Sequence, residues 1–160
     1  DERPLLFSLG GHPAFKCPVN EGEKYEDYYL EFEEVEDAPT WVLHKNGLQG
    51  EESRTVFNHS NKIALDAHIF DDDALIFKNL KSSHVQLKSK KSDQVLTVEF
   101  KGFPYLGVWA KPNGNFVCIE PWLGVTDKWY TDRKLETKEG IKTLEGKSTF
   151  DAFYTIEISE

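Results

Sequence analysis

The stretch Val85-Gln86-Leu87-Lys88 is followed, after a polar turn, by Leu96-Thr97-Val98-Glu99-Phe100. In both segments apolar and polar residues alternate strictly. Side chains two residues apart share a face only in an extended chain, so each segment is predicted to be a half-buried β-strand.

The same alternation recurs outside this stretch. It is seen in Leu30-Glu31-Phe32-Glu33 and again over 149–158, where Phe150, Tyr154 and Ile158 fall on one face. Denser apolar runs predict strands that are buried on both faces, and they are Trp41–Leu43, Ala74–Phe77, Leu106–Trp109 and Phe116–Ile119. Turn residues separate the segments, and no long window keeps a helical period. Residues 1–160 are therefore predicted to form a single all-β domain, a sandwich or barrel of nine or ten short strands.

Composition excludes several classes of function. The chain carries 19 basic and 28 acidic residues, and its net charge of −9 opposes general binding to nucleic acid or to anionic lipid. No apolar run approaches the length of a membrane span. Cys17 and Cys118 lack metal-ligand spacing and are expected to be free, buried thiols in a reducing cytoplasm, with one long-range disulfide as the alternative. The chain begins at Asp1 and contains no methionine, so it is expected to be a fragment or a processed chain.

The first candidate motif is Leu9-Gly10-Gly11-His12-Pro13-Ala14-Phe15. Pro13 favours an extended conformation for the residue before it, and the two glycines allow a close backbone approach. This predicts an imidazole held at a fixed angle beside the Phe15 ring. The alternative is a tight turn in which His12 only caps a neighbouring carbonyl.

The second motif is Phe116-Val117-Cys118-Ile119-Glu120-Pro121-Trp122. In a strand, Glu120 continues the row of Phe116 and Cys118, a costly place for a carboxylate that has no role. Pro121 cannot donate to a sheet ladder, so the strand is expected to end there with Glu120 at its mouth. Desolvation would raise the carboxyl pKa and suit a general base, and Trp122 would supply a flat face for a sugar. An end-of-strand glutamate in water is the alternative.

The third motif is Asp71-Asp72-Asp73, directly before the apolar run Ala74–Phe77. A solvated turn is the simplest interpretation of three adjacent acids. The functional interpretation is one carboxylate that accepts hydrogen bonds from sugar hydroxyls. The spacing of a calcium loop is absent, and no metal is expected.

Together these motifs resemble the aldose 1-epimerase (galactose mutarotase) superfamily, and within it the bacterial LacX-like branch. The resemblance runs over the whole chain in the right order and rests on Phe7–Phe15, Glu26–Phe32, Asp73–Phe77 and Phe116–Trp122 with Gly124 and Asp127. It implies an antiparallel β-supersandwich and a cytoplasmic enzyme that interconverts the α and β anomers of a free hexose without a cofactor.

Carried over onto this chain, the resemblance makes His12 the general acid and Glu120 the general base. Asp73 would bind the sugar, with Asp72 as the alternative, and Phe15 and Trp122 are expected to contact it.

Relatives of this kind are longer, and the chain is expected to correspond to their C-terminal half, with an N-terminal half or a partner chain missing. Two other functions remain open. One is a non-catalytic sugar-binding or sensor module, and the other is a hexose-6-phosphate 1-epimerase. The small number of arginines (Arg3, Arg54 and Arg133) argues against the second.

Overall fold

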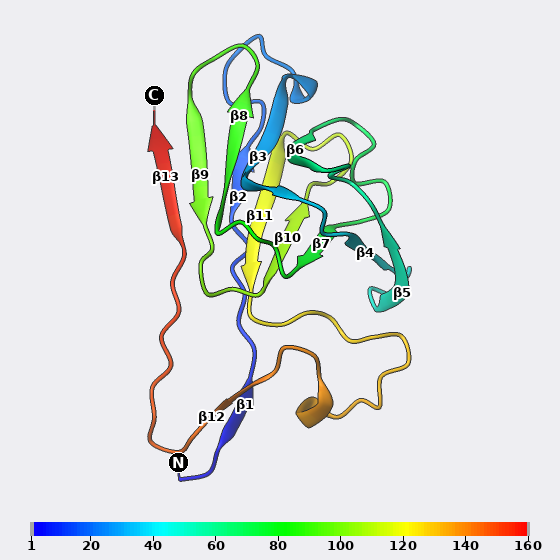
Figure 1. The fold of residues 1–160 in the computed structure, drawn as a ribbon, viewed down its shortest axis with the longest axis vertical. Coiled ribbons are helices and arrows are strands. Elements are labelled where there is room, and N and C mark those ends of the chain that lie inside the picture. Colours follow the sequence, from blue (N-terminus) through cyan, green and yellow to red (C-terminus); the bar gives the residue numbers. More distant parts are fainter. Residues whose placement is uncertain (1, 160) are drawn as a thin grey trace.

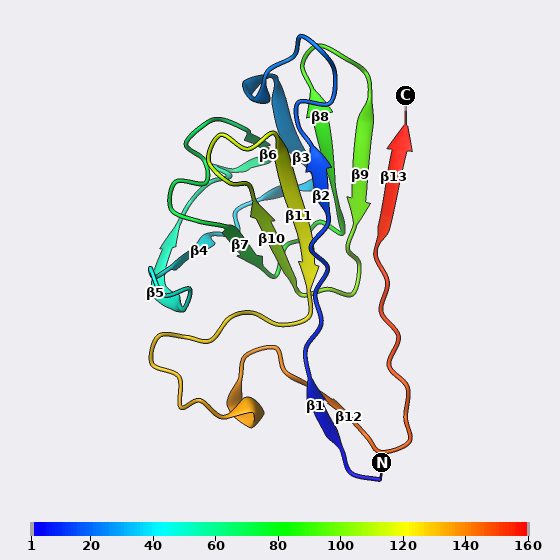
Figure 2. The ribbon, with the colours of Figure 1, turned by 180° about the vertical axis from the view of Figure 1, so that it is seen from behind.

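The structure is a computed structural model and describes residues 2–159. Most strands belong to two antiparallel sheets, which Figures 1 and 2 show from opposite sides. The six-stranded sheet has the order β2 (Ala14–Lys16), β11 (Phe116–Trp122), β10 (Tyr105–Trp109), β7 (Leu75–Lys78), β4 (Thr40–Leu43) and β5 (Gln49–Arg54). The five-stranded sheet has the order β13 (Thr155–Ser159), β9 (Val95–Glu99), β8 (His84–Ser89), β3 (Tyr28–Glu36) and β6 (Ser60–Ala64).

A third, small sheet pairs β1 (Leu5–Phe7) with β12 (Lys142–Leu144) and projects below the two large sheets (Figure 1). Two short 3₁₀ turns, η1 (Tyr25–Asp27) and η2 (Leu135–Thr137), are the helical elements of residues 2–159. In this range no helix has the length and apolar composition needed to cross a lipid bilayer.

The prediction of an all-β fold is confirmed, and every ladder between these strands is antiparallel. The described residues form thirteen strands rather than nine or ten. Three of them, β1, β2 and β12, have three residues each, too few for alternation to be recognised.

The hydrophobic core lies between the two large sheets. Strand β3 contributes Leu30 and Phe32, which are almost fully buried, and β11 contributes Val117 and Ile119. Because side chains alternate along a strand, Cys118, Glu120 and Trp122 of β11 face the other side of the six-stranded sheet.

Two expectations about the strands are wrong. The segment 149–158 is not one half-buried strand: β13 begins only at Thr155, and all five of its residues are exposed because it pairs with β9 alone at a sheet edge. Trp41, Val42 and Leu43 are half-buried rather than buried on both faces, since β4 lies next to the edge strand β5.

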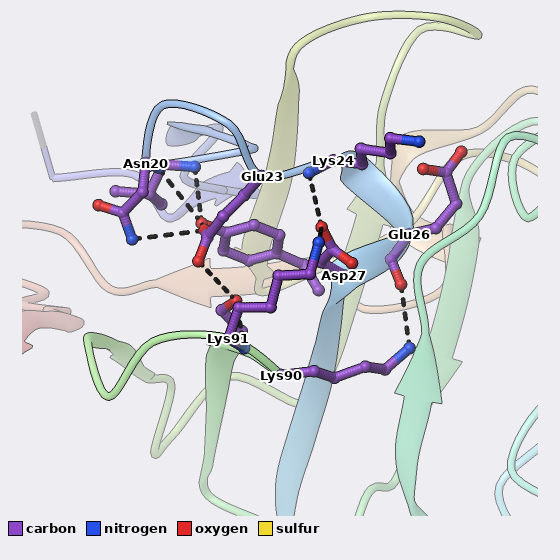
Figure 3. Close-up of polar contacts among 10 residues, drawn as sticks. Asn20, Glu23, Lys24, Glu26, Asp27, Lys90 and Lys91 are labelled. Carbon is purple, nitrogen blue, oxygen red and sulfur yellow. Dashed lines mark hydrogen bonds and ion pairs between the residues drawn. The ribbon is translucent and has the colours of Figure 1, made fainter.

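Polar contacts fix the connection that follows β2. Figure 3 shows Glu23 between Asn20 and the end of β8, where its carboxylate accepts hydrogen bonds from the Tyr28 hydroxyl and from Ser89 Oγ (3.0 Å). In the same view Lys91 Nζ lies 2.7 Å from Asp27 Oδ2. These bonds join the chain after β2 to the five-stranded sheet and so hold β2 against the body of the protein.

Candidate active site

The register between β2 and β11 places His12 opposite Glu120. Ala14 is paired with Cys118 in the ladder, and an isolated bridge pairs Gly10 with Trp122. His12 lies midway between Gly10 and Ala14, and Glu120 lies midway between Cys118 and Trp122. The side chains of His12 and Glu120 therefore point to the same face. His12 Nδ1 is 3.3 Å from Glu120 Oε1.

Backbone bonds hold the histidine at this place. The Gly11 amide donates to the Pro121 carbonyl at 2.9 Å, and the Ile119 amide donates to the Pro13 carbonyl at 3.3 Å. The imidazole ring meets Trp109 edge to face, with 6.5 Å between ring centroids. The aromatic neighbour of His12 is therefore Trp109 and not Phe15.

The expectation that β11 ends at Pro121 with Glu120 at its mouth is wrong, since the strand continues through Pro121 to Trp122. The main-chain groups of residues 119 and 121 face residues 9–13, as the bonds of Gly11 and Pro13 show. The missing N–H of Pro121 thus removes no bond to β10, where Pro121 pairs with Leu106. Glu120 lies within the strand and not at its mouth.

The two members of the pair differ sharply in exposure. The side chain of His12 is 64% exposed and that of Glu120 is 5% exposed. Burial raises the pKa of the Glu120 carboxyl, while the charge of His12 and a hydrogen bond from the Trp122 side chain oppose that shift. A carboxylate that is costly to keep ionised has a strong tendency to accept a proton, as a general base must.

Two glycines allow the Trp122 indole to lie flat on the sheet next to Glu120. A Cβ atom at Gly10 would lie 2.5 Å from Trp122 Cδ1, and one at Gly107 would lie 2.5 Å from Cζ2 and Cη2. Gly107 is paired with Glu120 across β10 and β11, so the ring spans the strands on both sides of the carboxylate. Trp122 therefore lies beside Glu120 on this face of the sheet.

A thiol completes this cluster. One donor atom each from His12, Cys118 and Glu120 lies within 4.8 Å of the others, a nitrogen, sulfur and oxygen set that a divalent cation could use. Burial, with a smaller contribution from the charge of Glu120, raises the pKa of Cys118 to about 11. Cys118 and Cys17 are both buried and free, as expected.

The structure does not bring the other two predicted residues into contact with this pair. Phe15 pairs with Val117 and packs against the hydrophobic core, because residues three apart in an extended segment lie on opposite faces. Asp73 precedes β7 with φ at 75°, and its Oδ1 accepts a hydrogen bond of 2.8 Å from the Ala74 amide. Asp73 is three residues before Ile76, and Ile76 is separated from Glu120 by Gly107 on the intervening strand β10. Asp73 therefore lies apart from the His12–Glu120 pair.

Sequence reasoning missed Gly107 and Trp109. Both lie on β10 and share the face of Glu120, since Gly107 pairs with Glu120 and Trp109 pairs with Cys118. The alternation Tyr105, Gly107, Trp109 in the sequence was the available signal.

Comparison with known proteins gives consistent results. The chain is 38% identical over 160 residues to protein LacX of Lactococcus lactis subsp. lactis, in both its plasmid and its chromosomal form. The match includes 98% of this chain and 54% of LacX, so the chain spans about half the length of the curated relatives that it matches. No protein-family model matches the chain.

Solved structures show the same likeness. A galactose mutarotase related enzyme from Lactobacillus acidophilus is 30% identical, with a TM-score of 0.89 over 99% of this chain and 54% of that one. A galactose mutarotase-like protein from Lactobacillus casei is 23% identical and has the same fold, with a TM-score of 0.86 over 99% and 55%. The predicted galactose mutarotase type of fold and the LacX-like resemblance are thereby confirmed.

Proposed function

Because the chain is 38% identical to about half of LacX and has the fold of the galactose mutarotase-related proteins, we propose that it is an aldose 1-epimerase. Its substrate is a free hexose, and its acid–base pair is His12 and Glu120. The observation that carries the proposal is the 3.3 Å contact between an exposed imidazole and a buried carboxylate on one sheet face. Groups so close together can act on the same sugar ring.

In the proposed mechanism Glu120 removes the proton of the anomeric hydroxyl while His12 gives a proton to the ring oxygen. The bond between C1 and the ring oxygen breaks, and an open-chain aldehyde forms. Rotation about C1–C2 presents the other face of the carbonyl, and ring closure reverses both proton transfers. The net reaction consumes nothing, so the mechanism uses no cofactor.

Trp122 is proposed to provide an apolar surface beside the sugar, next to the carboxylate that it contacts. Asp73 remains a proposed sugar ligand, with Asp72 as the alternative, at the start of β7. The proposal places the enzyme in the cytoplasm, where buried free thiols stay reduced.

The chain spans about half of LacX, and several of its apolar side chains outside the core are exposed. Among them are Leu5 at 59%, Phe153 at 83% and Ile158 at 68%. We therefore propose that the remainder of a LacX-like protein packs against these exposed apolar side chains.

Polarimetry of freshly dissolved α-glucose or α-galactose tests the activity. Replacing Glu120 by glutamine keeps the shape of the side chain and removes the base, so the rate is expected to fall by about 10²–10⁴-fold. The matched control is Glu136→Gln, an exposed position in η2. A full-length LacX assayed in parallel controls for the shorter chain.

An unchanged rate in Glu120→Gln would contradict the assignment. Saturable sugar binding with only the background rate of mutarotation would instead select the non-catalytic sugar-binding module.

A further inference from the structure

The thiol of Cys118 has no part in the proposed acid–base mechanism, although it lies beside both members of the pair. One ligand atom each from Cys118, His12 and Glu120 lies within 4.8 Å of the others. Among residues 2–159, no other three side chains of His, Cys, Asp or Glu bring their ligand atoms together in this way. The second thiol, Cys17, is also buried but is not part of this cluster.

The register of two neighbouring strands builds the cluster. Cys118 and Glu120 are two residues apart in β11, so their side chains share one face of the sheet. The chain that leads into β2 runs beside β11, as Figure 2 shows, and places His12 opposite Glu120. The sequence shows no metal-ligand spacing because the ligands come from two segments that are far apart along the chain.

The distances in the cluster suit a tetrahedral zinc ion. Zinc binds histidine nitrogen at about 2.0–2.1 Å and carboxylate oxygen at about 2.0–2.2 Å, so a tetrahedral angle places these two ligands about 3.4 Å apart. The observed distance from His12 Nδ1 to Glu120 Oε1 is 3.3 Å. A zinc-bound sulfur would lie about 3.6 Å from the other two ligands, so atoms now up to 4.8 Å apart must approach by roughly 1 Å. The side chain of His12 is 64% exposed and can make this adjustment.

The ligand set and its surroundings favour zinc over a hard cation. Calcium and magnesium prefer six or more oxygen ligands, whereas thiolate and imidazole suit zinc. The Trp122 side chain donates a hydrogen bond to the Glu120 carboxylate, the kind of outer contact that orients a metal ligand. Trp109 is paired with Cys118 and meets the His12 ring edge to face, so an apolar ring lies against the cluster.

Zinc at this place would block both proton transfers. The Cys118 thiol would release its proton to solvent, and the imidazole and the carboxylate would each donate a lone pair to the ion. A Glu120 lone pair engaged on zinc cannot accept the proton of a sugar hydroxyl. An imidazole bound through Nδ1 is not the imidazolium that a general acid requires. A fourth position remains open to water on the exposed side of His12.

We propose that His12, Cys118 and Glu120 form an inhibitory site for one Zn²⁺ ion. Binding of the ion depends on these three side chains alone, and only its effect on the rate rests on the proposed epimerase function. Because zinc must displace the proton of a buried thiol, its affinity should be lower than that of structural zinc sites, and a chelator should reverse the inhibition.

Two binding measurements test the site without an assay of activity. Zn²⁺ is titrated calorimetrically into the EDTA-treated and dialysed chain under a non-thiol reductant. Co²⁺ is added in a separate experiment, because a thiolate bound to cobalt gives a strong charge-transfer absorption in the near ultraviolet. We expect one zinc ion per chain and the thiolate absorption with cobalt.

Variants of the two thiols identify the ligand. Cys118→Ala should abolish the cobalt–thiolate absorption and weaken zinc binding by at least about tenfold, since loss of an outer partner alone costs about 10–100-fold. Cys17→Ala is the matched control, because it removes the other buried free thiol, and it should bind both ions as the wild type does.

Polarimetry measures the effect on the reaction. Saturating Zn²⁺ should lower kcat/KM of the wild type by about 10²-fold or more, which is the contribution of acid–base catalysis, and EDTA should restore it. At the zinc concentration that halves the wild-type rate, Cys118→Ala should keep about nine-tenths of its own zinc-free rate, as tenfold weaker binding requires.

Equal zinc affinity in the wild type and Cys118→Ala, or cobalt spectra without the thiolate absorption, would overturn the site. Zinc bound at the site without loss of rate would overturn its inhibitory role. A site that forms in a chain without mutarotase activity would support the metal site and refute the epimerase proposal. If Cys118→Ala does not fold, His12→Ala replaces it in the two binding measurements, because the His12 side chain is mostly exposed.

Discussion

Replacing Gly107 by alanine tests whether the flat placement of the Trp122 indole holds the candidate site together. The new Cβ atom would lie 2.5 Å from two ring atoms, whereas ordinary contacts begin at 3.4 Å. The ring edge must therefore move by roughly 1 Å, because Gly107 is fixed between Glu120 and Ile76 in the middle of the sheet. Overpacking of this kind costs about 1–3 kcal/mol of stability. A misplacement of ~1 Å near the reacting groups can also slow the reaction by about 10²-fold.

The assay is urea unfolding followed by circular dichroism, together with polarimetry. Gly50→Ala is a matched control: its Cβ atom would lie 2.5 Å from the end of the Glu52 side chain and 2.7 Å from His44 Nε2, but these side chains are 71% and 40% exposed and can move away. In Gly107→Ala/Trp122→Phe the shorter ring leaves room for the methyl group. The double variant should be more stable than the sum of the single effects by about 0.5–3 kcal/mol.

Two results would refute the reasoning. Wild-type stability and rate in Gly107→Ala would mean that the indole does not lie where the structure places it. Additivity of the two changes within ~0.5 kcal/mol would mean that Gly107 and Trp122 do not interact.

Three further predictions concern pH and the core. Burial raises the pKa of Glu120, and the base must be ionised to act, so kcat/KM should fall on acidification at a pH above the usual carboxyl range. Trp122→Phe removes a hydrogen bond that lowers this pKa, so the fall in kcat/KM should then occur at a higher pH. Profiles of kcat/KM against pH measure both effects. Because the pKa of Glu120 is raised in the folded state, its protonated form stabilises the fold at a pH below the unfolded-state pKa, and this contribution is lost as the pH rises through the folded-state pKa. Glu120→Gln should therefore be more stable than the wild type only above the folded-state pKa, as urea unfolding at several pH values will show. Phe77 is fully buried against Phe32 and Phe57, and Phe77→Ala should cost about 3–5 kcal/mol in the same assay; a loss below 1 kcal/mol would contradict this packing.

Local periodicity was sufficient to predict the strands around the opening motif. Val85–Lys88 and Leu96–Phe100 each alternate over several residues, and the structure pairs Val85 with Val98 and Leu87 with Leu96 on the core face. Strands of three residues, such as β2, cannot show a period. They depend instead on a neighbour far away in the sequence, and for β2 that neighbour is β11.

The candidate pair could be named from motifs, but its geometry could not. His12 and Glu120 are brought together by a register between distant strands, and a slip of one residue would have sent them to opposite faces. The position of Phe15 depends instead on spacing within one segment: it lies three residues from His12, so in an extended chain it faces the core and not the imidazole. The continuation of β11 through Pro121 is not predictable from the sequence, because the sequence does not say which neighbouring strand the Pro121 nitrogen faces.

The difference in exposure within the pair also has a chemical consequence for the proposed reaction. Glu120 is already desolvated, so a sugar that binds over it changes the environment of His12 far more than that of the carboxylate. The free energy needed to ionise the buried Glu120 carboxyl is already part of the stability of the folded protein. Water is removed from the His12 imidazole only when the substrate binds.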